Sequence, residues 1–348
     1  MPSVNNTLEL IKDEKTRKLF SVLYDKNDDI ISNQVKRYTQ AILKYSELFP
    51  DNCEHIQIFS SPGRTEIGGN HTDHNSGRVL AAGVNLDSIA VCSKNNQNVI
   101  TIYSKGYEHP FTVDLKLLDV QKDEKGTTTA IMRGIANRFY ELGYKIGGFV
   151  GYIDSNVIPG SGLSSSASIE VLLGTVLNYL YNDGNISAEQ IAIIGQYSEN
   201  IYFGKPCGLM DQMACSVGGF VNIDFRDPQN PIVRKIDFDF AAQGYSLLVV
   251  NTGGNHADLT QDYAAVPAEM KSVAKALGGR VCRDISMEIL IPNIRKLRSE
   301  VGDRAILRAM HFFAEDQRVV DEVEALEMGD FDAFLKLVTS SGNSSWKW

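Results

Sequence analysis

The residues best suited to chemistry lie in one short segment, 159–168, which reads PGSGLSSSAS. Glycines let backbone N–H groups approach a ligand closely, and serine hydroxyls can donate to phosphate oxygens or bind Mg²⁺. The apolar run that follows, IEVLLGTVLNYLY, is expected to form a buried helix whose N-terminus adds partial positive charge at the loop. The segment therefore predicts a phosphate-binding loop, formed by Gly160, Ser161, Gly162, Leu163, Ser164, Ser165 and Ser166.

Other interpretations of this loop fit less well. A flexible linker is disfavoured because the segment stands between an expected strand and an expected buried helix. Gly160 and Gly162 match two glycines of the dinucleotide-binding fingerprint, but Ser165 replaces the third. Asp183 lies about as far along the chain as the acidic residue of that fingerprint, yet no strand precedes it. The Walker A pattern GxxxxGK[ST] is absent from the sequence.

Strand and helix patterns alternate around the loop. Apolar spacing predicts helices in 5–48, and Pro50 ends the second of them. Further expected helices lie at 127–144, 169–181, 187–204, 259–277 and 286–328. Expected strands lie at 56–59, 99–104, 111–115, 147–158, 218–225 and 245–252. With a proline-rich turn at 227–231, the chain is expected to divide into a helical extension at 1–50 and domains at 51–226 and 227–348.

Composition narrows the class of protein. The 348 residues are 43% hydrophobic and 22% charged, with a net charge of −9, which argues against nucleic acid or an anionic membrane as main partner. No apolar run reaches the ~20 residues of a membrane span, and the N-terminus lacks the apolar core of a signal peptide. Five cysteines without a CxxC pair predict reduced thiols in a cytoplasmic protein.

Two further motifs accompany the loop. Residues 61–80 read SPGRTEIGGNHTDHNSGRVL, and residues 207–212 read CGLMDQ. Together with PGSGLSSSAS, and in this order, they resemble the GHMP small-molecule kinases and, within them, the galactokinase family. The resemblance implies an α+β fold of two domains, a ribosomal S5 domain 2-like N-terminal domain and a ferredoxin-like C-terminal domain. It also implies an ATP-dependent sugar-1-kinase that uses Mg²⁺ and acts on galactose, a small-molecule partner.

The resemblance assigns roles to individual residues. Asp211 matches the catalytic aspartate, which accepts or orients the proton of the anomeric hydroxyl, and Arg64 matches the cation that keeps it ionised. Ser166 and Glu199 match the Mg²⁺ ligands. The sugar-contacting positions correspond to Asn70, His71, Asp73, Gly208 and Tyr263.

Each residue also has a plainer interpretation. Asp211 could begin a helix, Glu199 could be a solvated charge, Arg64 could form a surface ion pair, and Tyr263 could pack in a core. His71, Asp73 and His74 in HTDH could bind a metal, although a structural zinc site needs about four ligands and no other cluster lies near.

The sequence departs from the family pattern at the sugar motif. Asn70 stands where galactokinases carry a glutamate that contacts the C6 hydroxyl, so a sugar changed at C6, such as galacturonate, is an alternative substrate. His74, Thr65 and Glu66 also differ from the usual residues.

The C-terminal end of the sequence also departs from the family pattern. The chain ends at SSGNSSWKW, before a third glycine-rich motif of the GGGFGGC type, and this predicts a fragment with weak or no turnover. A non-catalytic sugar and ATP sensor is a second alternative, which the presence of Asp211, Arg64 and Glu199 disfavours. A mevalonate- or homoserine-type kinase fits the loop but not CGLMDQ and NHTDH.

Overall fold

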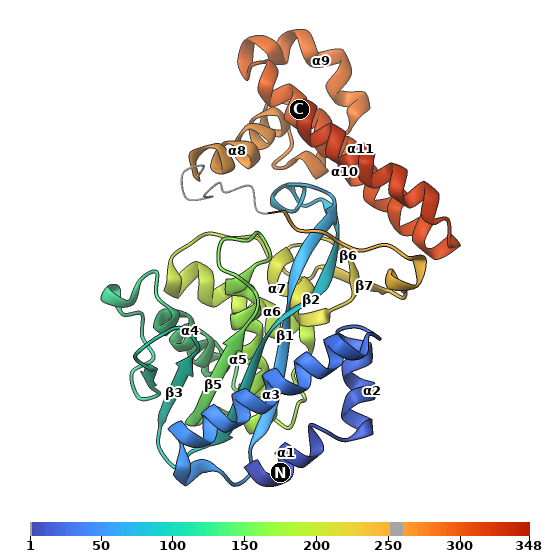
Figure 1. The fold of residues 1–348 in the computed structure, drawn as a ribbon. Coiled ribbons are helices and arrows are strands. Elements are labelled where there is room, and N and C mark those ends of the chain that lie inside the picture. The colour runs from blue at the N-terminus through green and yellow to red at the C-terminus, as the bar shows by residue number, and fades with distance from the viewer. Residues whose placement is uncertain (1, 251–259) are drawn as a thin grey trace. The chain divides into compact units, whose positions relative to one another are not determined.

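The structure is a computed structural model that describes residues 2–250 and 260–348 (Figure 1). The strands are β1 (Gln57–Gly68), β2 (Arg78–Lys94), β3 (Val99–Ser104), β4 (Phe111–Asp114), β5 (Phe149–Ser155), β6 (Phe220–Asp224) and β7 (Ile232–Ile236). The α-helices are α1 (Val4–Leu10), α2 (Glu14–Leu23), α3 (Asp28–Leu48), α4 (Thr128–Glu141), α5 (Ser165–Tyr181), α6 (Ala188–Ser198), α7 (Met210–Val217), α8 (Thr260–Ala276), α9 (Met287–Glu300), α10 (Asp303–Met328) and α11 (Phe331–Lys347).

The chain forms two compact units, and each is assembled from separate stretches of sequence. Unit 1 contains Met1–Gly63, Val84–Cys207 and Asp211–Ser216. Unit 2 contains Arg64–Gly83, Gly208–Met210 and Val217–Trp348. Strands β1 and β2 contribute residues to both units, because each unit boundary in this region falls within a strand.

The strands form one seven-stranded mixed sheet, in the order β4-β3-β5-β2-β6-β7 with β1 paired to β2, and unit 1 is built on its β4-β3-β5-β2 part. β5 pairs antiparallel with β2, with Tyr152 opposite Val91, and parallel with β3, with Tyr152 opposite Tyr103. The parallel pairing requires a crossover, and α4 supplies it between β4 and β5.

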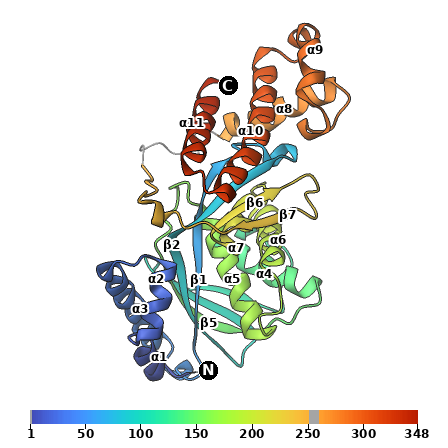
Figure 2. The same cartoon turned by 90° about the vertical axis from the view of Figure 1, so that its right-hand side faces the viewer.

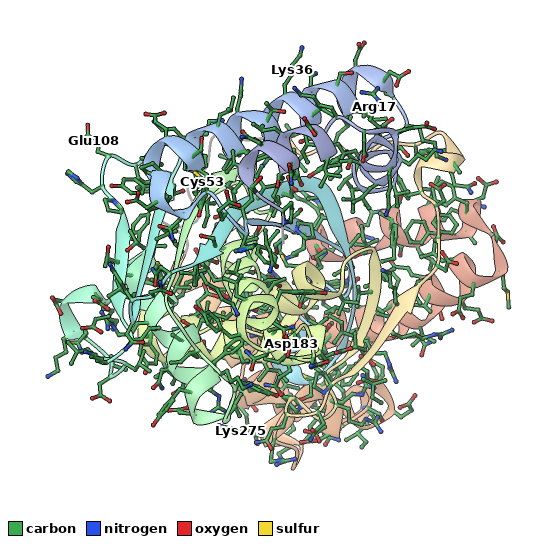
Figure 3. The ribbon with its side chains drawn as sticks, turned by 90° about the horizontal axis from the view of Figure 1, so that it is seen from below. Arg17, Lys36, Cys53, Glu108, Asp183 and Lys275 are labelled. Carbon is green, nitrogen blue, oxygen red and sulfur yellow. The ribbon has the colours of Figure 1, made fainter. Side chains whose placement is uncertain are left out.

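Helices cover both faces of this sheet, as Figure 2 shows for the helices α1 to α3 on one side and α4 to α6 on the other. One core packs side chains of α4, α5 and α6 against the sheet, including Ile135, Leu172 and Ile194. A second core packs Ile42 and Tyr45 of α3 against the opposite face. Lys36, on the outer side of α3, extends away from the sheet in Figure 3.

Local sequence signals explain where several helices begin. Asp13 accepts a hydrogen bond from the Thr16 amide at 2.7 Å and so caps α2. Asn27 caps α3, and Ser187 caps α6. Such caps satisfy backbone N–H groups that have no partner inside the helix.

Unit 2 combines the antiparallel β2-β6-β7 part of the sheet with the helices α8 to α11. The first residues of β2 pair with β6, and β6 pairs with β7. One core gathers side chains of α8, α9 and α10, with Phe312 fully buried at its centre. Another lies between the sheet and the helices α10 and α11, around Leu80 and Phe334.

The structure corrects one expected element. Residues 245–250, predicted as part of a strand, form none, and no described strand pairs with them. Leu248 is 83% exposed and Val250 is 78% exposed. An apolar, β-branched run becomes a strand only where a neighbour pairs its backbone and covers its side chains. The expected strands at 99–104, 111–115, 147–158 and 218–225 are confirmed as β3, β4, β5 and β6.

Candidate active site

The glycine-serine loop connects β5 to α5 in unit 1, as the sequence predicts. Gly160, Gly162 and Ser164 have positive φ angles of 76°, 77° and 56°, so the chain turns through left-handed positions before α5 begins. A Cβ atom at either glycine would meet no atom within 4 Å, so the backbone angle is what requires glycine there. The loop therefore leads directly to the N-terminus of a 17-residue helix, a favourable place for a phosphate.

Ser164 joins this loop to Asp211. The Ser164 hydroxyl donates a hydrogen bond to Asp211 Oδ2. Asp211 lies in the first turn of α7, where the helix dipole stabilises a negative charge. The loop and the expected catalytic aspartate thus meet within unit 1.

Ser166 and Glu199 also meet in unit 1. Ser166 Oγ lies 3.2 Å from Glu199 Oε1, and Glu199 opens a π-type turn, Glu199–Phe203, at the end of α6. Two adjacent oxygen ligands of an octahedral Mg²⁺, each at about 2.1 Å from the ion, would lie about 3 Å apart. Lys205 Nζ already lies 3.2 Å from the same Glu199 oxygen. The serine hydroxyl and the carboxylate are oxygen donors of the kind that Mg²⁺ prefers, and their spacing would suit two ligands of one ion.

A second buried carboxyl group, Glu170, shares a hydrogen-bond donor with Glu199. The Gln212 amide nitrogen donates to Glu199 Oε2 and to Glu170 Oε2, at 2.9 Å in each case. Burial raises the pKa of Glu170 well above its ordinary value, and the negative charge of Glu199 raises it further. A neutral Glu170 would limit the repulsion between two buried carboxyl groups.

The sugar motif forms a tight turn in unit 2. It follows β1 and contains Asn70 and then His71, whose φ of 61° is left-handed, before the short 3₁₀ turn Asp73–Asn75. Burial lowers the pKa of His71, although the nearby Asp73 acts in the opposite direction. A Cβ atom on Gly208 would lie 2.2 Å from Asp73 Oδ2, so a larger residue there would displace the Asp73 carboxylate.

Asn70 is held by helices that the sequence motif does not contain. Its Nδ2 donates to Ser345 Oγ at 3.1 Å. Its backbone carbonyl lies 3.0 Å from His311 Nε2, and His311 Nδ1 lies 2.8 Å from Ser344 Oγ. Because a carbonyl can only accept, His311 carries a proton on Nε2. Burial lowers the pKa of His311 and so favours the neutral ring, in which Nδ1 accepts from Ser344.

The expected residues divide between the units. Ser164, Ser166, Glu199 and Asp211 lie together in unit 1, whereas the sugar-motif residues lie in unit 2: Asn70, His71, Asp73 and Gly208. Arg64, on β1, also belongs to unit 2. Tyr263 lies in α8, and its side chain is outside the described residues.

Sequence reasoning missed Glu170, Lys205 and Gln212. Gln212 ends the CGLMDQ motif, and Glu170 is an acid within the apolar helix α5, which is an unusual place for a charge. Both features are present in the sequence, but only the fold shows that the Gln212 and Glu170 side chains share one hydrogen-bond network.

Two kinds of feature are absent from the part of the chain that the structure describes. Among residues 2–250 and 260–348, no three or more His, Cys, Asp or Glu side chains gather in a way that could hold a metal ion. Within that same part of the chain, no helix combines the length and apolar character needed to cross a bilayer.

Two family matches cover the motifs. Residues 43–94 match the galactokinase galactose-binding signature, and residues 129–219 match the GHMP kinases N terminal domain. The first range contains the sugar motif, and the second contains the glycine-serine loop, Glu199 and Asp211.

Comparisons over most of the chain also find galactokinases. A galactokinase of Streptomyces coelicolor is 32% identical over 290 residues, covering 82% of this chain and 73% of the relative. A galactokinase of Lacticaseibacillus casei is 29% identical over 306 residues, covering 86% of this chain and 76% of the relative. The crystal structure of Lactococcus lactis galactokinase complexed with galactose superposes with a TM-score of 0.71 at 24% identity, over 88% of this chain and 78% of that one. The expected mixed α and β fold is thereby confirmed, and the chain belongs to the galactokinase family of GHMP kinases.

Proposed function

We propose that this protein transfers the γ-phosphoryl group of ATP to the anomeric hydroxyl of galactose, giving galactose 1-phosphate and ADP. The observation that carries the proposal is the meeting of the glycine-serine loop with Asp211 through Ser164. In one unit, that contact joins a phosphate-binding loop to a carboxylate able to act on a hydroxyl proton.

Asp211 is the group proposed to act on the attacking sugar. One oxygen of its carboxylate, Oδ2, accepts from Ser164, which restrains the orientation of the side chain. The sugar hydroxyl would donate to this carboxylate as its oxygen attacks the γ-phosphorus, and Asp211 would accept or orient that proton.

Ser166 and Glu199 are the residues proposed to hold Mg²⁺. When bound, the ion would neutralise charge on the phosphates of ATP. Glu199 supplies a buried carboxylate whose Oε1 faces Ser166, and the loop and the N-terminus of α5 supply backbone donors for the phosphates.

The sugar contacts are proposed for unit 2. His71 and Asp73 offer a ring nitrogen and a carboxylate, which can form paired hydrogen bonds with vicinal hydroxyls and so distinguish epimers. Gly208 leaves room for the Asp73 carboxylate. Arg64 is proposed to offset charge during transfer, and Tyr263 to contact the sugar.

A sugar changed at C6 is the second candidate substrate. Asn70 is neutral and its amide nitrogen is engaged by Ser345, so the residue brings no negative charge that would repel a C6 carboxylate. Galacturonate is therefore the informative comparison with galactose.

We also infer a reducing, cytoplasmic setting. Cys53, Cys92, Cys207 and Cys282 are present as thiols rather than disulfides, which supports this location. Burial raises the pKa of the Cys92 and Cys207 thiols, so both are poor nucleophiles.

The test is a sugar panel with ATP and Mg²⁺, in which ³¹P NMR detects sugar 1-phosphate even at slow turnover. Galactose, galacturonate and glucose are compared, with Asp211→Ala as the control. We expect product from galactose and a loss of at least about 100-fold in Asp211→Ala. Product formation that persists in this variant would contradict the role of Asp211.

Two other results have clear meanings. A strong preference for galactose over galacturonate would remove the C6-modified alternative. Binding of both ATP and galactose, measured by calorimetry, with no product after prolonged incubation would favour a sugar and ATP sensor instead.

A further inference from the structure

The two oxygens of the Glu199 carboxylate have different surroundings. Oε1 faces Ser166 and Lys205, each at 3.2 Å. Oε2 faces inward and accepts from Gln212 at 2.9 Å. The side chain is only 3% exposed, so the protein alone, and not bulk water, sets its orientation.

Gln212 spans two acids with a single nitrogen. Its amide nitrogen has two N–H groups, and its two nearest acceptors are Glu199 Oε2 and Glu170 Oε2, with Cys207 Sγ farther away at 3.7 Å. Both Gln212 and Glu170 are fully buried. A Cβ atom on Gly195 would lie 3.3 Å from Glu170 Oε2 and 3.4 Å from Gln212 Cγ, so α6 packs closely over the pair.

The choice of an amide for this contact has a chemical consequence. An arginine or lysine at the same place would neutralise Glu199 and weaken its attraction for a cation. A neutral amide orients the carboxylate and leaves its charge available. Lys205, the cation now at Oε1, is 62% exposed, so it can give way to a metal at little cost.

Gln212 also follows Asp211 directly in α7. One residue of this helix turn contacts Ser164 of the loop, and the next contacts Glu199. The helix therefore holds the proposed proton acceptor and the proposed metal ligand in one rigid piece of backbone.

We propose that Gln212 is a positioning residue that orients the Glu199 carboxylate for Mg²⁺, with Glu170 as the anchor that fixes the Gln212 amide. The inference rests on the proposed function, because it takes Glu199 as a ligand of the metal that accompanies ATP. Groups that orient metal ligands commonly change metal affinity by 10- to 100-fold when they are removed.

The test measures metal affinity directly, by Mn²⁺ electron paramagnetic resonance in the presence of ADP. Gln212→Met keeps the length of the side chain and removes both N–H groups, and we expect Mn²⁺ affinity to fall by about 10-fold or more. Glu170→Gln keeps an acceptor oxygen and should stay within about 3-fold of the unchanged protein, whereas Glu170→Met should match Gln212→Met.

The double variant Glu170→Met/Gln212→Met separates orientation from simple packing. If Glu170 acts only through Gln212, the double variant should lose no more Mn²⁺ affinity than Gln212→Met alone. Galactose affinity, measured by calorimetry, should be unchanged in all four variants, because the sugar motif lies in unit 2.

The outcomes distinguish the inference from the function on which it rests. If the unchanged protein binds no Mn²⁺ with ADP, the proposed metal site is wrong, and the inference is overturned with it. If the unchanged protein binds Mn²⁺ and Gln212→Met retains that affinity, only the inference is overturned. Multiplicative losses in the double variant would overturn the role of Glu170 as anchor.

Discussion

At the scale of single residues, buried carboxyl groups are the unusual feature of this chain. Glu170 and Glu199 share the amide of Gln212, but Glu322 on α10 has no such partner. Neither of its carboxyl oxygens has a hydrogen-bond partner among the described residues. Oε2 packs against Gly68, where a Cβ atom would lie 2.0 Å away. Glu322 should therefore weaken the fold when it is ionised.

The variant Glu322→Gln tests how much the ionised carboxyl group lowers the stability of the fold, because this loss depends on pH. Burial raises the pKa of Glu322 from 4.5 to about 7, with Arg318 acting against this and Asp321 adding to it. The folded protein thus binds the proton more tightly, and stability falls as pH rises from 4.5 towards 7. Since one pKa unit corresponds to about 1.4 kcal/mol, the variant should gain about 2 kcal/mol more stability at pH 8 than at pH 5.

Urea unfolding of both proteins at the two pH values measures this difference. Glu324→Gln is the matched control, because Glu324 lies on the same helix and is exposed. It should show no such dependence on pH. An equal gain for Glu322→Gln at pH 5 and pH 8 would mean that the carboxyl group titrates normally in the folded protein.

At the scale of elements, Asp87 ties the N-terminal helices of unit 1 to the sheet. It lies on β2 and accepts from Tyr24 at 2.6 Å, from Ser60 at 2.5 Å and from Arg37 of α3 at 2.5 Å. Arg37 also donates to the carbonyl of Asp154 on β5 at 2.8 Å. These elements are distant in sequence, and one buried carboxylate brings them together.

Asp87→Asn should loosen this junction without changing its shape. The variant leaves the Arg37 guanidinium, whose side chain is 10% exposed, without its main counter-charge. Breaking one partner of a buried ion pair typically costs 3–5 kcal/mol, and the remaining contacts to Asp154 place the expected loss near the lower end, about 3 kcal/mol. Chemical denaturation measures it, with Asp123→Asn, an exposed acid, as control. A loss below about 1 kcal/mol would refute the role of Asp87.

The helices and strands also show how much of the fold could be predicted from the sequence alone. Helices such as α3 and α6 were predictable because caps and apolar spacing are local signals. The run 245–250 was not, because strand formation depends on a neighbour that a local pattern does not reveal. The family resemblance assigned roles to Ser166, Glu199 and Asp211. The contact of Gln212 with Glu170 joins α7 to α5, and only the folded backbone brings these helices together.

At the scale of the whole molecule, the motifs divide between two units rather than following the order of the chain. The glycine-serine loop, Glu199 and Asp211 belong to unit 1, and the sugar motif with Gly208 belongs to unit 2. With a net charge of −9, an anionic nucleotide needs local donors, and we propose that the loop and the helix N-terminus of unit 1 provide them. Galactose and the nucleotide are therefore each expected to stabilise a different unit.

Hydrogen exchange with each ligand alone tests this division. A ligand at 100 times its Kd stabilises the folded state by about 2.7 kcal/mol, which slows exchange through unfolding of its binding region by about 100-fold. Galactose should slow amides at 69–76 in unit 2, and ADP with Mg²⁺ should slow amides at 160–166 in unit 1. Glucose, the C4 epimer, should have a much smaller effect at 69–76 than galactose. Galactose protection confined to 160–166 would contradict the assignment of the sugar contacts to unit 2.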